Sequence, residues 1–359
     1  MSNKLHPSIK KIGNRHYRVN PSLSQINPEE EDEEISDYNE STNLESCNLI
    51  IQAVHVQNEK FVCKIHIPSI FFGYLIGRGG TKKLDLEKST RCRITMSRRA
   101  PEIEIESTKE SCIEECIRII QMKVSEVRQR SRPSHYLELH LNSDDAVKSI
   151  QRFKEQVYSK YGQETLEKTF NIREGLFQSS EKFHITLSVF LVGDEFEYRI
   201  LESDIEAFLA SEEAKTLFQD GPFLVNVREL DIMNDDPTST SVLYSKVHGG
   251  KRIQDLANAV TMLLREKQWS TDYKRDQVKL HATLMKSSNY TDEEISTFGR
   301  NFSVEEILKD FKDYEFVKEC TIDEIRIAQV RQVGEKGYKY DSTIKVYQNG
   351  KTSFVKKYE

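Results

Sequence analysis

Phe183-His184-Ile185-Thr186-Leu187 and Leu280-His281-Ala282-Thr283-Leu284 are two copies of one short pattern, and they decide the fold of the C-terminal part of this 359-residue chain. Along a β-strand, successive side chains alternate between two faces. Each copy therefore places a histidine and a threonine on one face and apolar side chains on the other. Positions 184 and 281 leave room for half of a two-lobed domain around each strand.

These residue types suit acid–base cleavage of a phosphodiester. One group must take a proton from the nucleophile, and another must give a proton to the leaving oxygen. Histidine can do either, because its ordinary pKa of about 6.5 keeps both protonation states accessible. Threonine hydroxyls can donate hydrogen bonds to phosphate oxygens. We therefore expect the two strands to face each other across a cleft, with four catalytic residues: His184, Thr186, His281 and Thr283.

The alternative is that each motif holds an ordinary strand histidine, which is the better reading of either copy alone. The pairing favours the catalytic interpretation. Of the nine histidines in the chain, only these two are followed two residues later by threonine in an apolar, strand-like run.

Composition excludes several classes of protein. Hydrophobic residues make up 37% of the chain and charged residues 31%, with a formal net charge of −6. There is no apolar run long enough for a membrane span and no apolar signal-peptide core. The six cysteines are scattered without metal-ligand spacing, so we expect reduced thiols, no metal and no cofactor.

Charge is divided into blocks at the N-terminus. Residues 1–20 carry five bases and no acid, whereas residues 21–46 carry nine acids and no base. Such blocks are usually disordered, so a disordered tail is predicted over residues 1–50. The residues near Tyr17 are also a candidate segment for docking to a partner. The acidic run is either a solvated tail or a segment that competes with nucleic acid for a basic groove.

Residues 59–131 read as a βααββα unit, with a glycine turn between two short helices at Ile76–Gly80. Glycine lets a backbone come close to a ligand, and the free amides that open the following helix attract phosphate. Eight bases and two acids lie between residues 77 and 99. The candidate RNA contacts are Gly77, Arg78, Gly79, Gly80, Lys82, Lys83 and Arg93.

This unit resembles a type I KH domain through Ile67-Pro68, Gly73, Leu75–Gly80, Thr90 and Arg93-Ile94. The resemblance implies single-stranded RNA as the ligand, with its backbone clamped by the glycine loop. Lys83 stands where the family commonly has an apolar residue, which is a departure from the family's pattern.

Residues 134–359 read as an α+β domain whose elements come in two similar sets. The pattern predicts one helix near Glu197–Phe218, a strand at Val242–Val247 and one strand over Thr321–Val330. Tyr244 and Lys246 alternate beside a proposed catalytic strand, so they are candidates to line the cleft, although strand tyrosines more often serve packing.

This half resembles the two-histidine phosphoesterase superfamily. The resemblance implies a bilobed pseudo-symmetric fold, a metal-independent phosphodiesterase, and RNA with 2′,3′-cyclic or 2′–5′ linkages as substrate. The combination with a KH domain resembles a nuclear subunit of the activating signal cointegrator complex. Transcription coactivation, the alkylation-damage response, and a helicase and other subunits as partners are then implied. The alternative function is a non-catalytic scaffold that reads an RNA end.

Overall fold

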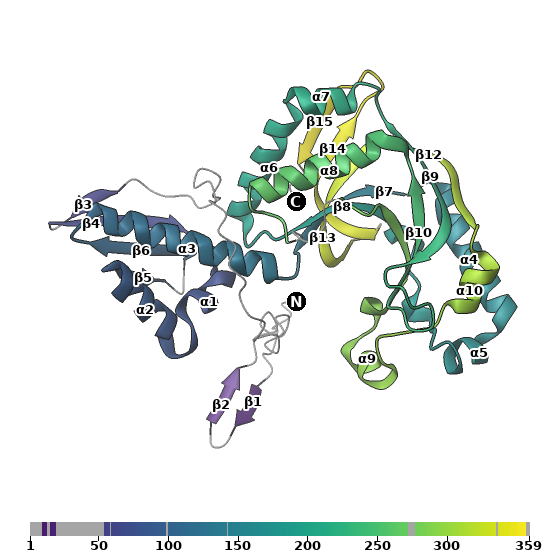
Figure 1. The fold of residues 1–359 in the computed structure, drawn as a ribbon, viewed down its shortest axis with the longest axis horizontal. Helices are drawn as coiled ribbons and strands as arrows, with labels where there is room; N and C mark the ends of the chain where they lie inside the picture. Colours follow the sequence, from purple (N-terminus) through teal and green to yellow (C-terminus); the bar gives the residue numbers. More distant parts are fainter. Residues whose placement is uncertain are drawn as a thin grey trace, which may run out of the picture.

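The computed structural model describes residues 9–12, 15–18, 54–57, 59–97, 100–141, 143–271, 277–334 and 337–356. Most of the tail predicted to be disordered, residues 1–50, lies outside these ranges. Within it, β1 (Ile9–Ile12) and β2 (Arg15–Arg18) pair antiparallel, which that prediction did not include. The remaining described residues build the two bodies seen in Figure 1.

The first body is a four-stranded sheet packed against three helices, and it has the predicted βααββα order. Apolar residues at alternating strand positions, such as Ile65 and Ile105, meet Ile113 and Ile120 of the long helix in one core. One short edge strand was not predicted. The elements are β3 (His55–Gln57), β4 (Lys60–His66), α1 (Phe72–Ile76), α2 (Thr81–Thr90), β5 (Arg93–Met96), β6 (Glu102–Ser107) and α3 (Glu110–Arg130), with sheet order β3-β4-β6-β5.

The second body is built on a nine-stranded sheet whose strand pairs are all antiparallel. Its order is β12-β9-β10-β11-β8-β7-β13-β14-β15, so the two motif strands β8 and β11 meet at its centre. The strands are β7 (His135–His140), β8 (His184–Phe190), β9 (Phe223–Ile232), β10 (Val242–His248), β11 (His281–Lys286), β12 (Glu315–Ile322), β13 (Glu324–Gly334), β14 (Gly337–Val346) and β15 (Thr352–Lys356).

Helices cover one face of this sheet. Amphipathic helices α4 and α8 bury Phe153 and Leu256 in the same core as Ile185 and Ala282 of the motif strands. Figure 1 shows α6, α7 and α8 together along one side of the domain. The helices are α4 (Asp144–Tyr161), α5 (Gln163–Lys168), α6 (Glu195–Leu209), α7 (Glu212–Phe218), α8 (Gly250–Glu266), α9 (Asp292–Phe298) and α10 (Glu305–Phe311).

Three expectations for this domain were wrong. The motif strands do not face each other across a cleft, because they are neighbours in one sheet. The helix expected over Glu197–Phe218 is two helices, since Ser211 accepts a hydrogen bond from Ala214 and caps a new start. The strand expected over Thr321–Val330 breaks at Asp323, with β12 pairing β9 in one half and β13 pairing β7 in the other.

The two bodies are joined by a buried ion pair. Arg128, at the end of α3, is 3% exposed and lies 2.6 Å from Glu197 of α6, which is 1% exposed. The guanidinium also donates to the Leu191 carbonyl and lies over the rings of Phe71 and Trp269. Removing one partner of such a pair typically costs about 3–5 kcal/mol, because it leaves a buried charge uncompensated.

A close backbone contact lies beside this ion pair. A Cβ added at Gly193 would lie 2.4 Å from Pro68 Cβ and 3.1 Å from Ile70 Cδ1, so glycine is required there. His66 Nε2 and Asp194 Oδ2 are 2.9 Å apart across the same junction.

Among the described residues, no helix is both long and apolar enough to cross a membrane.

We predict that Gly193→Ala lowers the free energy of unfolding by about 1–3 kcal/mol, the usual cost of overpacking. The measurement is denaturant unfolding of the full chain. Gly73→Ala is the matched control, because a Cβ there has nothing within 4 Å and lies in α1. Equal unfolding midpoints for the two variants would show that the junction accommodates the added methyl group without strain.

Candidate active site

The two motifs meet through one strand pairing. Ala282 pairs with Ile185 between antiparallel strands β11 and β8. Antiparallel register then places His281 opposite Thr186 and Thr283 opposite His184. Because Ile185 and Ala282 are buried in the helix-covered core, all four motif side chains lie on the other face. Each is partly exposed to solvent, so the predicted residues share one surface.

The two imidazoles are held in the same way. His184 Nδ1 is 2.7 Å from the Lys182 carbonyl, and His281 Nδ1 is 2.7 Å from the Lys279 carbonyl. A carbonyl can only accept, so Nδ1 carries a hydrogen and the neutral ring has its acceptor at Nε2. Each ring can thus exchange a proton through Nε2 without losing its anchor, as acid–base catalysis requires.

A buried carboxylate lies behind His184. Glu138 of β7 is 2% exposed, and its Oε2 is 3.7 Å from His184 Nδ1. Burial lowers the pKa of His184, opposed by the Glu138 charge and by the Lys182 carbonyl. Lys286 and His140 lower the pKa of His184 further. The ring therefore favours the neutral form.

Different neighbours surround His281. The Tyr244 ring lies edge-on to it with centroids 5.3 Å apart, and the Tyr244 hydroxyl donates to Asp231 Oδ2 at 2.8 Å. Lys246 pairs with His281 in the β10–β11 register, and its Nζ is 3.5 Å from Glu229 Oε2. Both residues expected to line the cleft thus lie next to His281.

Sequence reasoning missed Glu138. Its signal was the alternation of Tyr136, Glu138 and His140 with leucines, which predicts a strand with three polar or aromatic residues on one face. What the alternation could not tell is that β7 lies beside β8, which brings Glu138 opposite Thr186. Among the described residues, no group of three or more His, Cys, Asp or Glu is arranged to hold a metal ion.

The glycine loop of the first domain has the geometry of a backbone clamp. Gly77, Gly79 and Gly80 have φ values of 71°, 61° and 81°, in the region that favours glycine. A Cβ added at Gly79 or Gly80 would meet nothing within 4 Å, so the loop leaves open space. The first amides of α2 follow directly, where a phosphate is favoured.

The predicted basic contacts around this loop fall into two groups. Arg78, Lys82 and Arg93 are exposed. Lys83 is half-buried, and its Nζ is 3.5 Å from Glu87 Oε1, which also accepts a hydrogen bond from the Ile94 amide. Lys83 stands where an apolar residue is usual for the family. It therefore takes part in polar contacts between α2 and β5.

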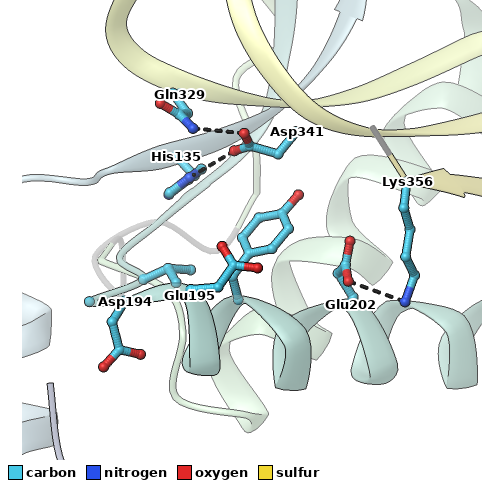
Figure 2. A pocket seen from close by; sticks show the side chains of 10 residues that line it. His135, Asp194, Glu195, Glu202, Gln329, Asp341 and Lys356 are labelled. Atoms are coloured by element: carbon cyan, nitrogen blue, oxygen red, sulfur yellow. Dashed lines mark hydrogen bonds and ion pairs between the residues drawn. The ribbon is translucent and has the colours of Figure 1, made fainter. Parts of the chain in front are cut away.

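A cavity of about 530 Å³ lies elsewhere, between α6 and β7, β13, β14 and β15 (Figure 2). Its charged side chains are paired: Asp341 with His135 and Gln329, and Glu202 with Lys356. It contains none of the four motif residues. We therefore place the candidate active site at the β8–β11 seam and not in this cavity.

Comparison with known proteins assigns both domains. A family model described as "KH domain" matches residues 62–122, and one described as "AKAP7 2'5' RNA ligase-like domain" matches residues 133–346. The protein is thus a KH RNA-binding domain followed by a 2′-5′ RNA ligase-like phosphoesterase domain.

The chain is also similar to a curated protein and to a solved structure. The chain is 27% identical over 297 residues to "Activating signal cointegrator 1 complex subunit 1" of Mus musculus, covering 78% of each protein. A solved structure titled "Crystal structure of phosphoesterase" is 9% identical, with a TM-score of 0.35, over 63% of this chain and all of that one. From the match over residues 133–346, the chain belongs to the AKAP7 2'5' RNA ligase-like domain family.

Proposed function

We propose that this protein is an RNA-binding phosphodiesterase that needs no metal and cleaves an RNA phosphodiester of the 2′,3′-cyclic or 2′–5′ type. The observation that carries the proposal is the crossed arrangement at the sheet centre. Each histidine lies opposite the threonine of the other motif, and each is anchored at Nδ1 by the carbonyl two residues earlier.

The geometry supports a two-histidine mechanism. A neutral imidazole takes a proton from water at Nε2 while the water oxygen forms a bond to phosphorus. The bond between phosphorus and the leaving sugar oxygen breaks, and that oxygen takes a proton from Nε2 of the other, protonated imidazole. Thr186 and Thr283 donate hydrogen bonds to the non-bridging oxygens, where charge develops.

The KH loop supplies affinity for the RNA strand in this proposal. Its three glycines with positive φ let a phosphate backbone approach, and Arg78 and Lys82 are exposed beside it. Backbone contacts of this kind hold the strand without reading its sequence. The phosphoesterase site then acts on RNA that the first domain retains.

Membership in a complex is proposed only from the sequence similarity to the mouse relative. The mouse relative is named as a subunit of the activating signal cointegrator 1 complex. We propose that this chain has the same place in a nuclear complex with a helicase, acting in transcription coactivation and the response to alkylation damage. Affinity purification of the tagged full chain from a nuclear extract should recover a helicase. If no helicase is recovered, or if the tagged chain lies outside the nucleus, membership in such a nuclear complex is contradicted.

We predict that His184→Ala and His281→Ala each lower kcat on a 2′,3′-cyclic-phosphate oligonucleotide by about 10²-fold or more, since each removes one proton transfer. EDTA should leave the wild-type rate unchanged. The measurement is a steady-state assay of the full chain on 2′,3′-cyclic and 2′–5′-linked oligonucleotides.

His55→Ala is the matched control, because His55 is exposed on an edge strand of the other sheet. It should keep the wild-type rate. Either motif variant retaining full activity would rule out the mechanism. A wild-type protein that binds these oligonucleotides without turnover would favour the scaffold function.

The glycine loop of the KH domain can be tested as the RNA clamp. The double variant Arg78→Asp, Gly79→Asp should bind single-stranded RNA about tenfold or more weakly, because it places negative charge against the phosphate backbone. Wild-type affinity should also fall with increasing salt. Arg118→Asp, on the exposed part of α3, makes the same type of charge change elsewhere. If both proteins bind alike in a fluorescence-anisotropy titration, the loop is not the clamp.

A further inference from the structure

Glu138 is a buried carboxylate that the fold itself does not explain. It is 2% exposed, and within the described part of the chain its Oε2 accepts no hydrogen bond. A buried carboxylate oxygen without a hydrogen bond is costly, so it calls for a reason. Its nearest partners are two imidazoles: His140 Nδ1 at 3.4 Å from Oε1 and His184 Nδ1 at 3.7 Å from Oε2.

Glu138 is ionised in this setting. Burial acts to raise the pKa of its carboxyl, but His140, His184 and the Arg326 guanidinium together lower the pKa below its ordinary value. Arg326 lies directly across from Glu138 in the β7–β13 pairing. The carboxylate is therefore a fixed negative charge beneath the site.

The strand register shows that this charge is not repeated in the other half. Glu138 lies opposite Thr186 on the strand next to β8. The corresponding position next to β11, opposite Thr283, is Tyr244. The two motifs are alike in sequence and in their Nδ1 anchors, but one has a carboxylate beside it and the other a phenol ring. The pseudo-symmetry is broken at this position.

We propose that Glu138 is the positioning residue of His184: its carboxylate stabilises the imidazolium that forms when His184 accepts the proton of the attacking water, which makes His184 the general base and His281 the general acid. This inference rests on the proposed phosphodiesterase function. In the step, the water proton moves to His184 Nε2, phosphorus gains the water oxygen, and the leaving oxygen takes the proton from His281 Nε2. His184, still 10% exposed, then returns its proton to solvent.

Charged and titratable groups from several elements surround the pair of His184 and Glu138. Glu138 and His140 come from β7, Lys286 from β11, Arg326 from β13, and the Lys182 carbonyl from the preceding turn. Tyr136 adds an aromatic ring at 5.1 Å. Burial keeps His184 neutral before reaction, and Glu138 is the acidic side chain that counters the nearby cations once the ring is charged.

The test is the titration of His184 followed by NMR of the imidazole nitrogens in the full chain. In Glu138→Gln, His184 should bind its proton about tenfold more weakly, the usual effect of removing an opposite charge at this distance. On the cyclic-phosphate substrate, kcat should fall about tenfold with KM unchanged, and the acidic limb of the pH profile should move to lower pH. Glu138→Asp should restore part of both effects.

Glu106→Gln is the matched control, because it removes a partly exposed carboxylate from strand β6 of the other sheet. It should leave the titration of His184 unchanged. A folded Glu138→Gln protein with unchanged His184 titration would overturn the proposal and show a purely structural role. Absence of wild-type turnover with the titration difference present would instead overturn the proposed function alone.

A measurement on the wild-type chain covers the case in which Glu138→Gln does not fold. The carboxyl carbon of Glu138 should show a chemical-shift step at the pH where His184 titrates, because the two groups are 3.7 Å apart. A Glu138 signal without that step would overturn the proposal with no substitution needed.

Discussion

The pairing of Ala282 with Ile185 is the contact on which the phosphoesterase domain depends. It joins two halves of the chain into one sheet and sets which side chains meet across the seam. A shift of this register by one residue would turn the motif side chains of the shifted strand toward the core. The apolar residues of both strands oppose such a shift, because they are buried under α8 and α4. The packing of one face therefore fixes the chemistry of the other.

Local patterns in the sequence predicted much of this arrangement. Alternation in the two motifs was enough to place His184 and Thr186 on one face and Ile185 in the core. The glycine loop was likewise predicted as a turn between helices, and Gly77 and Gly79 have the positive φ that such a turn needs. Each of these features depends on residues close together in the chain, where period and backbone preference decide the structure.

Features that depend on distant pairing were not predictable in the same way. Asp323 lies inside a stretch that reads as one strand, but the chain crosses there from one half of the sheet to the other. Glu138 reads as a polar position on an ordinary strand, and only the neighbouring β8 gives it a role. The ion pair of Arg128 with Glu197 joins residues of two domains, and no spacing in the sequence links them.

The central claim is that both imidazoles act on one phosphorus atom. The most direct measurement is a crystal structure of the full chain with an uncleaved cyclic nucleotide analogue. We predict that its phosphate lies between Nε2 of His184 and Nε2 of His281, with the hydroxyls of Thr186 and Thr283 on the non-bridging oxygens. A phosphate bound in the cavity beside His135, with the β8–β11 seam empty, would contradict it.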